Sequence, residues 1–165
     1  GGIGAESGAP RDFRAPVENR DQIPSMLFGG FKRCLYRVQK FHSDPERRFA
    51  VILDRDALKW FKPARGTFHI YYRLDGHDHL YEPDFVAETE SAKYLCEPKS
   101  AAEMNTPEVR AKARAAVEWC ANATAHERNH GGKKAWTYLL IPHDRIEENK
   151  TLEGLAAAHG GADRA

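Results

Sequence analysis

The sequence lacks long apolar runs, has few cysteines and carries no surplus of charge of one sign. It contains no run of about 18 apolar residues that could span a bilayer. No basic segment leads into an apolar stretch in the manner of a secretion signal. We therefore expect a cytoplasmic protein with no membrane partner. Cys34, Cys96 and Cys120 are odd in number and far apart, which argues against a disulfide framework and favours free thiols.

The near balance of charge limits what can attract a polyanion. Lysine and arginine total 25, aspartate and glutamate total 24, and the net charge is +1. No field of the whole protein would draw in nucleic acid. Such binding would need local basic patches or further parts of a larger protein. The sequence also has no GxxxxGK[ST] loop, so any use of ATP would depend on regions outside it.

The length and composition indicate one domain with a substantial core, because the chain has 165 residues of which 41% are hydrophobic. Residues 1–24 are rich in Gly, Pro, Ala and charge, and we expect them to form a flexible tail or linker. The domain is expected over 25–156, followed by a frayed C-terminus over 157–165. Because no initiating methionine is present, we expect a piece of a longer polypeptide.

The spacing of apolar residues predicts alternating strands and helices. Ser43-Asp44-Pro45-Glu46 begins a helix, either with Ser43 as the cap and Glu46 reaching back to it or with Asp44 as the cap. Asp75-Gly76 predicts a hairpin turn. The expected strands are 26–41, 67–74, 80–88, 93–99 and 136–141, and the expected helices begin at 43 and cover 57–61 and 106–124. This order indicates an α/β fold with a central mixed β-sheet flanked by helices.

Three residues that can carry chemistry fall on two neighbouring predicted strands. Asp84 lies on one strand, and Glu97 and Lys99 lie on the next. Neighbouring strands are about 5 Å apart, so carboxylates on them can share one cation. Glu97 and Lys99 are two residues apart and therefore face the same side of a strand. The pattern predicts a single site formed by these three side chains.

Hydrolysis of a phosphodiester needs these residue types. Magnesium prefers oxygen ligands and keeps several waters. It lowers the pKa of a bound water and neutralises charge on the phosphate. Asp84 and Glu97 would be its carboxylate ligands, and the backbone carbonyl of Pro98 could add a third oxygen. Lys99 would orient the attacking water or stabilise the developing negative charge.

The Pro83-Asp84 pair, twelve intervening residues and Glu97-Pro98-Lys99 together resemble the signature of the PD-(D/E)xK nuclease superfamily. Within that superfamily, the chain resembles the C-terminal endonuclease domain of type III restriction enzyme Res subunits and related helicase–nucleases, over about Phe28 to Leu155. The further similarity lies in Phe41-His42-Ser43 with Glu46 and Phe49-Ala50, Trp60-Phe61, Tyr81-x-Pro83-Asp84-Phe85-Val86, Ala115-Ala116 with Trp119, and Trp136-x-Tyr138.

The resemblance implies a restriction-endonuclease-like core and a magnesium-dependent endodeoxyribonuclease, with manganese as a substitute, acting on double-stranded DNA in phage defence. It implies that Asp84, Glu97 and Lys99 are catalytic and that Glu46 and Lys112 are auxiliary residues. It also implies partners outside this chain: an ATP-using helicase region of the same polypeptide and a methyltransferase subunit. Because cleavage of both strands generally needs two active sites, a dimer is a further expectation.

Several alternatives stay open from the sequence. Glu46 either completes a capping box with Ser43 or joins the metal site. Lys112 lies at the edge of an apolar helix stripe, where lysine side chains often extend to solvent. Pro98 replaces the β-branched residue common in the family and removes a sheet donor, which predicts an edge or a local distortion of its strand.

The basic residues and the function have open alternatives as well. A group of basic side chains either contacts DNA phosphates or forms a solvated face. This group consists of Lys32, Arg33, Arg37, Lys40, Arg47 and Arg48. Instead of a restriction nuclease, the chain could be a stand-alone nuclease that acts on DNA ends, junctions or flaps. It could also be an inactive DNA-binding or assembly module of the same fold.

Overall fold

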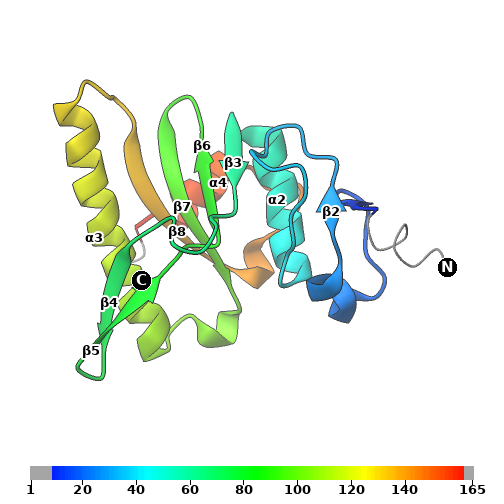
Figure 1. Cartoon of the computed structure of the whole chain (residues 1–165), viewed down its shortest axis with the longest axis horizontal. Coiled ribbons are helices and arrows are strands. Elements are labelled where there is room, and N and C mark those ends of the chain that lie inside the picture. The colour runs from blue at the N-terminus through cyan, green and yellow to red at the C-terminus, as the bar shows by residue number, and fades with distance from the viewer. Residues whose placement is uncertain (1–8, 162–165) are drawn as a thin grey trace.

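A four-stranded mixed sheet forms the centre of the molecule (Figure 1). The computed structural model describes residues 9–161. The strands, in their order across the sheet, are β3 (Lys59–Phe61), β6 (Phe85–Glu88), β7 (Ala92–Lys99) and β8 (Ala135–Pro142). β3–β6 and β6–β7 are antiparallel pairs, and β7–β8 is a parallel pair. The fold is therefore mixed α/β, with its sheet flanked by helices as the sequence predicted.

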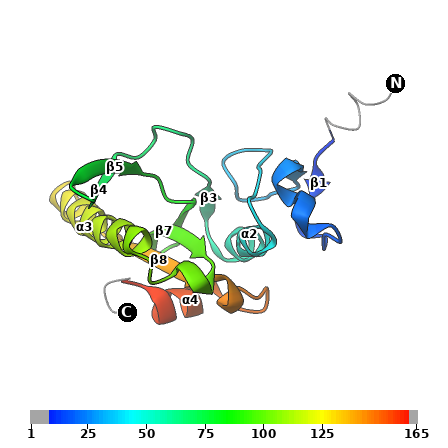
Figure 2. The same cartoon turned by 90° about the horizontal axis from the view of Figure 1, so that it is seen from below.

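Helices cover both faces of this sheet, as Figure 2 shows from below. They are α2 (Asp44–Asp56), α3 (Pro107–Asn129) and α4 (Leu152–His159). α3 connects the parallel strands β7 and β8, a connection too long for a tight turn. The side chains of Ser43 and Thr106 cap α2 and α3 by accepting the backbone N–H groups of Glu46 and Val109. The predicted starts of both helices are confirmed.

A separate hairpin packs beside α3 (Figure 1). It consists of β4 (Ile70–Leu74) and β5 (His77–Tyr81), joined by a turn at Asp75 and Gly76. Both turn residues have positive φ, which matches a type I′ turn and confirms the predicted hairpin. The prediction of one returning strand over 80–88 is wrong, because the chain leaves β5 after Tyr81 and enters the central sheet only at Phe85.

The two faces of the sheet form two distinct cores, which follow the alternation of side chains along each strand. On β7, Tyr94 and Cys96 belong to the core beneath α2 and α4, whereas Leu95 belongs to the core beneath α3. The first core is rich in phenylalanine. Its fully buried phenylalanine rings are Phe13, Phe28, Phe41, Phe49 and Phe85. The second core carries the hydroxyl groups of Tyr81 and Tyr138.

The N-terminal part of the chain differs most from the prediction. Residues 1–8 of the expected tail lie outside the described residues, but Phe13, Val17 and Ile23 are buried in the first core. The tail prediction is therefore wrong for residues 9–24. This segment contains β1 (Arg11–Asp12) and η1 (Arg20–Ser25), and β1 pairs with β2 (Phe28–Gly29).

Three further predictions along the chain need correction. The expected strand over 26–41 is mostly irregular, with β2 and isolated bridges at Cys34 and Gln39. The expected helix over 57–61 is instead the strand β3, because its backbone pairs with β6. At the C-terminus, α4 continues through 157–159 and Gly160 bridges Leu139, so fraying is wrong for 157–161.

Candidate functional site

The site lies at the lower end of the sheet in Figure 1, where β7 ends and β6 begins. The last β6–β7 pair in the register is Phe85↔Cys96, so the next residues outward are Asp84 and Glu97. The chain segment at Asp84 has left the regular ladder, whereas Glu97 still pairs with Leu140 of β8. The structure thus brings together the two carboxylates that the sequence placed on neighbouring strands.

Asp84 and Glu97 form a pair of interacting carboxyl groups whose pKa values are both raised. Glu97 is only 9% exposed. Burial, and next the charge of Asp84, raise the pKa of Glu97 well above its ordinary value. Burial, and next the charge of Glu46, raise the pKa of Asp84. Two neighbouring carboxylates repel each other once both are ionised, so the pair favours either a shared proton or a bound cation.

Two tyrosines hold the carboxyl of Glu97 in place. The Tyr81 hydroxyl donates to Glu97 Oε1 at 2.7 Å, and the oxygens of Tyr81 and Tyr138 lie 2.9 Å apart. Each tyrosine has one proton to donate, so Tyr138 donates to Tyr81 when Tyr81 donates to Glu97. Burial, and next the charge of Glu97, raise the pKa of Tyr81 far above its ordinary value. Both hydroxyls therefore stay protonated and keep Glu97 oriented toward Asp84.

Glu46 reaches the site from α2, but its carboxylate does not close a capping box. It is 5% exposed and accepts a 2.8 Å hydrogen bond from the ammonium group of Lys62. Lys62 Nζ also lies 3.4 Å from the backbone carbonyl oxygen of Asp84. Glu46 therefore lies near Asp84 with a lysine as its direct partner, and its participation in a metal site stays a prediction.

Lys99 and Lys112 lie at the edge of the site. The ammonium of Lys99 is 3.6 Å from Glu103 Oε2, and its charge lowers the pKa of Glu97. The ammonium of Lys112 is 3.5 Å from Glu108 Oε1 and sits over the ring of Tyr81, 5.5 Å from its centroid. Lys99 thus has a direct electrostatic effect on the carboxyl pair, whereas Lys112 contacts the tyrosine that holds it.

Sequence reasoning did not assign a role to Lys62, Tyr81, Tyr138 or His143. His143 follows β8 directly; burial lowers its pKa, and the nearby charges of Glu46 and Lys99 act on it. Lys62 and His143 belong to no motif that the sequence analysis identified. Tyr81 and Tyr138 lie in two of the segments that carry the family resemblance, but the resemblance assigned them no role.

A divalent cation at this site would have the two carboxyl groups of Asp84 and Glu97 as its side-chain ligands. Within residues 9–161, no group of three or more His, Cys, Asp or Glu side chains is arranged to hold a metal ion. Zinc, which favours four nitrogen or sulfur ligands, does not match this set. Magnesium is commonly held by one or two carboxylates with waters in its other positions. The Asp84–Glu97 pair matches that set, and the Pro98 carbonyl as a third oxygen stays a prediction.

The position of Pro98 in β7 is compatible with its lack of a backbone N–H group. β7 is a central strand, but the pairing with β6 ends at Cys96, two residues before Pro98. On that side Pro98 therefore lies beyond the ladder, where a missing N–H leaves no β6 carbonyl without its donor. In the described part of the chain, β7 therefore lacks a partner on the β6 side only at its C-terminal end, where Pro98 lies.

The group of basic residues divides into buried and exposed members. Arg47 is 2% exposed and donates to Asp44 and to the backbone carbonyl of Phe13, so it cannot reach DNA. Arg48 pairs with the same aspartate. The remaining members, Lys32, Arg33, Arg37 and Lys40, are exposed.

Other parts of the surface offer less chemistry. An open groove of ≈ 860 Å³ at the opposite end of the sheet is lined by residues that include Arg55, Asp56 and Tyr94. Arg55 and Asp56 are bound to each other there, 2.7 Å apart. The described residues that line the groove therefore include no pair of interacting carboxyl groups with raised pKa values, unlike the end of the sheet at Asp84 and Glu97. We therefore assign the candidate site to the carboxyl pair.

Comparison with known proteins adds no assignment, because no protein-family model and no curated protein matches this chain. Among residues 9–161, no helix is both long enough and apolar enough to cross a membrane.

Proposed function

We propose that this chain is a magnesium-dependent DNA endonuclease domain of the PD-(D/E)xK kind. The observation that carries the proposal is the Asp84–Glu97 pair at a strand end, with Glu97 buried, both pKa values raised and Lys99 nearby. Such a pair destabilises a fold unless a proton or cation accompanies it. Groups with perturbed pKa values gather at functional sites. The pair therefore points to a function that needs a cation.

The fold supports the proposal in a second way. The central sheet has the order of a helix, three strands, a crossover helix and a parallel strand, which supports the restriction-endonuclease-like core that the resemblance implies. Glu97 lies on β7 of the β6–β7 hairpin, and Asp84 directly precedes β6.

Each residue of the site has a separate task in phosphodiester hydrolysis. Asp84 and Glu97 would hold the ion, with the Pro98 carbonyl as a third oxygen. When bound, magnesium or manganese would lower the pKa of a water molecule and neutralise charge on the phosphate. Lys99 would leave Glu103 and stabilise the negative charge that develops on the phosphate. Tyr81 would fix the Glu97 carboxylate, as groups behind a metal ligand commonly do.

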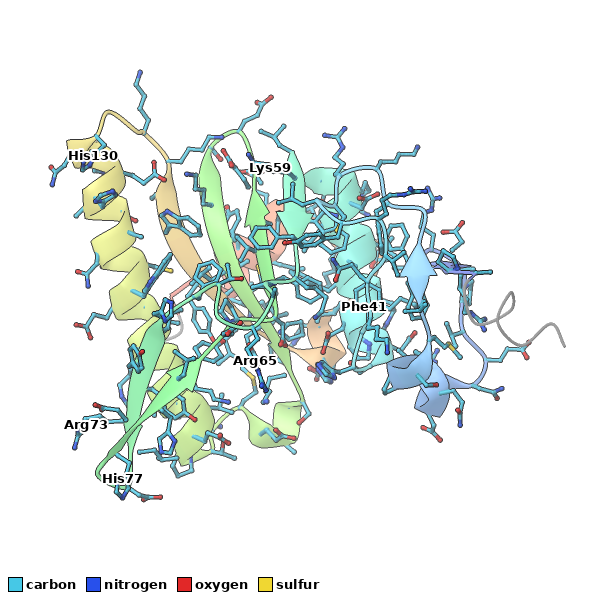
Figure 3. The ribbon with its side chains drawn as sticks, in the orientation of Figure 1. Phe41, Lys59, Arg65, Arg73, His77 and His130 are labelled. Carbon is cyan, nitrogen blue, oxygen red and sulfur yellow. The ribbon has the colours of Figure 1, made fainter. Side chains whose placement is uncertain are left out.

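A loop above the site supplies a contact for the DNA backbone. Arg65 lies in the segment between β3 and β4, in front of the lower end of the sheet (Figure 3). The backbone N–H of Gly66 donates to Glu82, two residues before Asp84, and this bond ties the loop to the site. A guanidinium at this place can pair with a phosphate next to the cleaved one.

The wider setting follows from the resemblance to type III restriction enzymes and helicase–nucleases. The domain would work with an ATP-using helicase region of the same polypeptide and a methyltransferase subunit. Cleavage of both DNA strands would pair two copies of the site.

Incubation of the chain with supercoiled plasmid tests the proposal, with magnesium or manganese present and with EDTA as the metal-free arm. The expected result is nicked or linear plasmid in both metals and intact plasmid in EDTA. Asp84→Asn should abolish cleavage, because the amide is a poorer ligand for the ion than the carboxylate. Glu88→Gln at the far end of β6 is the matched control and should cleave as the unaltered chain does.

Manganese binding to the same samples separates the alternatives. Binding without cleavage would favour an inactive module or a nuclease that needs its helicase. A chain that neither cleaves nor binds manganese would contradict the proposed function. Cleavage confined to branched DNA would favour the stand-alone nuclease.

A further inference from the structure

Lys62 is a cation built into the site, and nothing in the sequence pattern assigns it. It follows β3 directly, and only 14% of its side chain is exposed. Its ammonium lies 2.8 Å from Glu46 Oε1 and 3.4 Å from the Asp84 carbonyl oxygen. The ring centroid of Phe85 is 4.3 Å from the same nitrogen, close enough for a cation–π contact. Lys62 is therefore fixed on several sides.

The contact with Lys62 neutralises Glu46. A buried carboxylate is stable only with a partner of opposite charge. For Glu46, with 6% of its side chain exposed, Lys62 is that partner. Within the described residues, Glu46 does not form a three-ligand group with Asp84 and Glu97. The ammonium group of Lys62 therefore already compensates the negative charge of Glu46.

The site contains two carboxylate environments that differ in this respect. Within residues 9–161, no ammonium group is bonded to the side-chain oxygens of Asp84 or Glu97, because Lys62 pairs with Glu46 and Lys99 with Glu103. Glu46 has such an ammonium group. In nucleases with two metal ions, the ions lie roughly 3.5–4 Å apart and need carboxylates on both sides. Here the carboxylate on one side is already paired.

We propose that Lys62 occupies the place of a second divalent ion, so that the site binds one ion between Asp84 and Glu97. This inference rests on the proposed function. Lys62 supplies a permanent positive charge next to the Asp84 backbone without exchanging ligands with solvent. Cleavage should therefore rise with metal concentration without cooperativity.

The stoichiometry of manganese binding tests the inference on the full chain. Calorimetry counts the ions, and electron paramagnetic resonance distinguishes an isolated ion from two neighbouring ions, whose spectra broaden through coupling. The unaltered chain should bind one ion with an isolated spectrum. Lys62→Met keeps the apolar stem over Phe85 and removes the charge. It should bind a second ion, and the broadened spectrum should appear.

Two control variants test which side chains determine the binding of a second ion. Lys59→Met, at the other end of β3, removes an exposed lysine that pairs with Glu88. It should keep the count at one. Adding Glu46→Gln to Lys62→Met should return the count from two to one, because the second ion would lose its carboxylate. Lys62→Gln, which can still donate to Glu46, serves if the methionine variant does not fold.

The outcomes separate this inference from the proposed function. Two ions in the unaltered chain would overturn the inference and leave the nuclease proposal standing. A count of one in folded Lys62→Met and Lys62→Gln would also overturn it, and Lys62 would be a structural ion pair between α2 and β3. No ion in the unaltered chain would overturn the proposed function itself.

Discussion

The two ends of the β6–β7 hairpin contain the same residue types in opposite electrostatic arrangements. At the upper end in Figure 3, near the labelled Lys59, Glu88 lies 2.6 Å from Lys134 and 3.5 Å from Lys59. The hydrogen bond from Lys134 lowers the pKa of Glu88. At the lower end, Asp84 and Glu97 face each other and their pKa values are raised.

This difference teaches where the hairpin is built for stability and where it is built for binding. The two ends are separated only by the length of β7, which has eight residues. Ion pairs at the upper end stabilise the sheet. Like charges at the lower end oppose folding until a proton or a cation binds to them. Substituting one carboxylate at each end therefore tests whether the upper end serves stability and the lower end serves binding.

The largest difference is expected from one substitution made at each end. Glu97→Gln should reduce cleavage by at least about 100-fold, because the ion that would stabilise the transition-state charge loses a carboxylate ligand. In the absence of metal, the same variant should be more stable by about 1 kcal/mol or more, because the repulsion of Asp84 is removed. Cleavage assays and thermal unfolding in EDTA measure both effects.

Glu88→Gln should behave in the opposite way. It should cleave normally and lose at most about 1 kcal/mol, the usual range for ion pairs near the surface. If Glu97→Gln were less stable than the unaltered chain in EDTA, the lower end would be a structural hydrogen-bond network.

Removing the hydroxyl group of Tyr81, which donates to Glu97, should weaken manganese binding tenfold to hundredfold. Tyr81→Phe removes the 2.7 Å hydrogen bond to Glu97 Oε1. Groups that orient a metal ligand typically change metal affinity by about 10–100-fold. Manganese titration should show weaker binding by this factor. Tyr71→Phe, on the exposed face of β4, is the control and should bind manganese as before.

The pH dependence of stability should have opposite signs at the two ends. Glu97 has an ordinary pKa of 4.5 in the unfolded chain and a higher one when folded. Between these values the folded state binds more protons, so stability in EDTA should fall as pH rises through this window. Saturating manganese, or Glu97→Gln, should flatten this fall.

For Glu88 the folded pKa is lowered, so its stabilisation is present above its ordinary value of 4.5 and is lost as pH falls through the folded pKa. Unfolding curves of Glu97→Gln and Glu88→Gln across this range isolate each contribution. Equal pH profiles for these two variants would show that the ends do not differ as described.

The smallest effect is expected from the lysines at the upper end. Lys134→Met should lower stability by less than about 1 kcal/mol, and less again in high salt, because exposed ion pairs are screened. Chemical denaturation at two salt concentrations measures it. A loss that does not depend on salt would mean that the methylene stem of Lys134 stabilises the fold by packing.

The sequence predicts the lower end better than its surroundings, for a physical reason. Asp84 and Glu97 are close in sequence, and hairpin register alone brings them together. Caps at Ser43 and Thr106 are also local signals, and the structure contains both. The role of the carboxyl pair in catalysis stays a prediction.

Contacts between distant segments could not be predicted in this way. Lys62 and Glu46 are sixteen residues apart and belong to different elements, so no periodicity links them. The break at 82–84 was missed because apolar residues on both sides continue the pattern of a strand. Residues 57–61 match a short helix locally, but pairing with β6 outweighs that preference.

The N-terminal segment has a consequence for anyone who shortens this protein. A chain that starts at residue 25 would remove Phe13 and Ile23, both fully buried, and would uncover Phe28 and Phe41 in the same core. It would also deprive the buried Arg47 guanidinium of the Phe13 carbonyl, to which it donates at 2.8 Å. We expect such a truncated protein to aggregate on expression, so a usable truncation begins before Arg11.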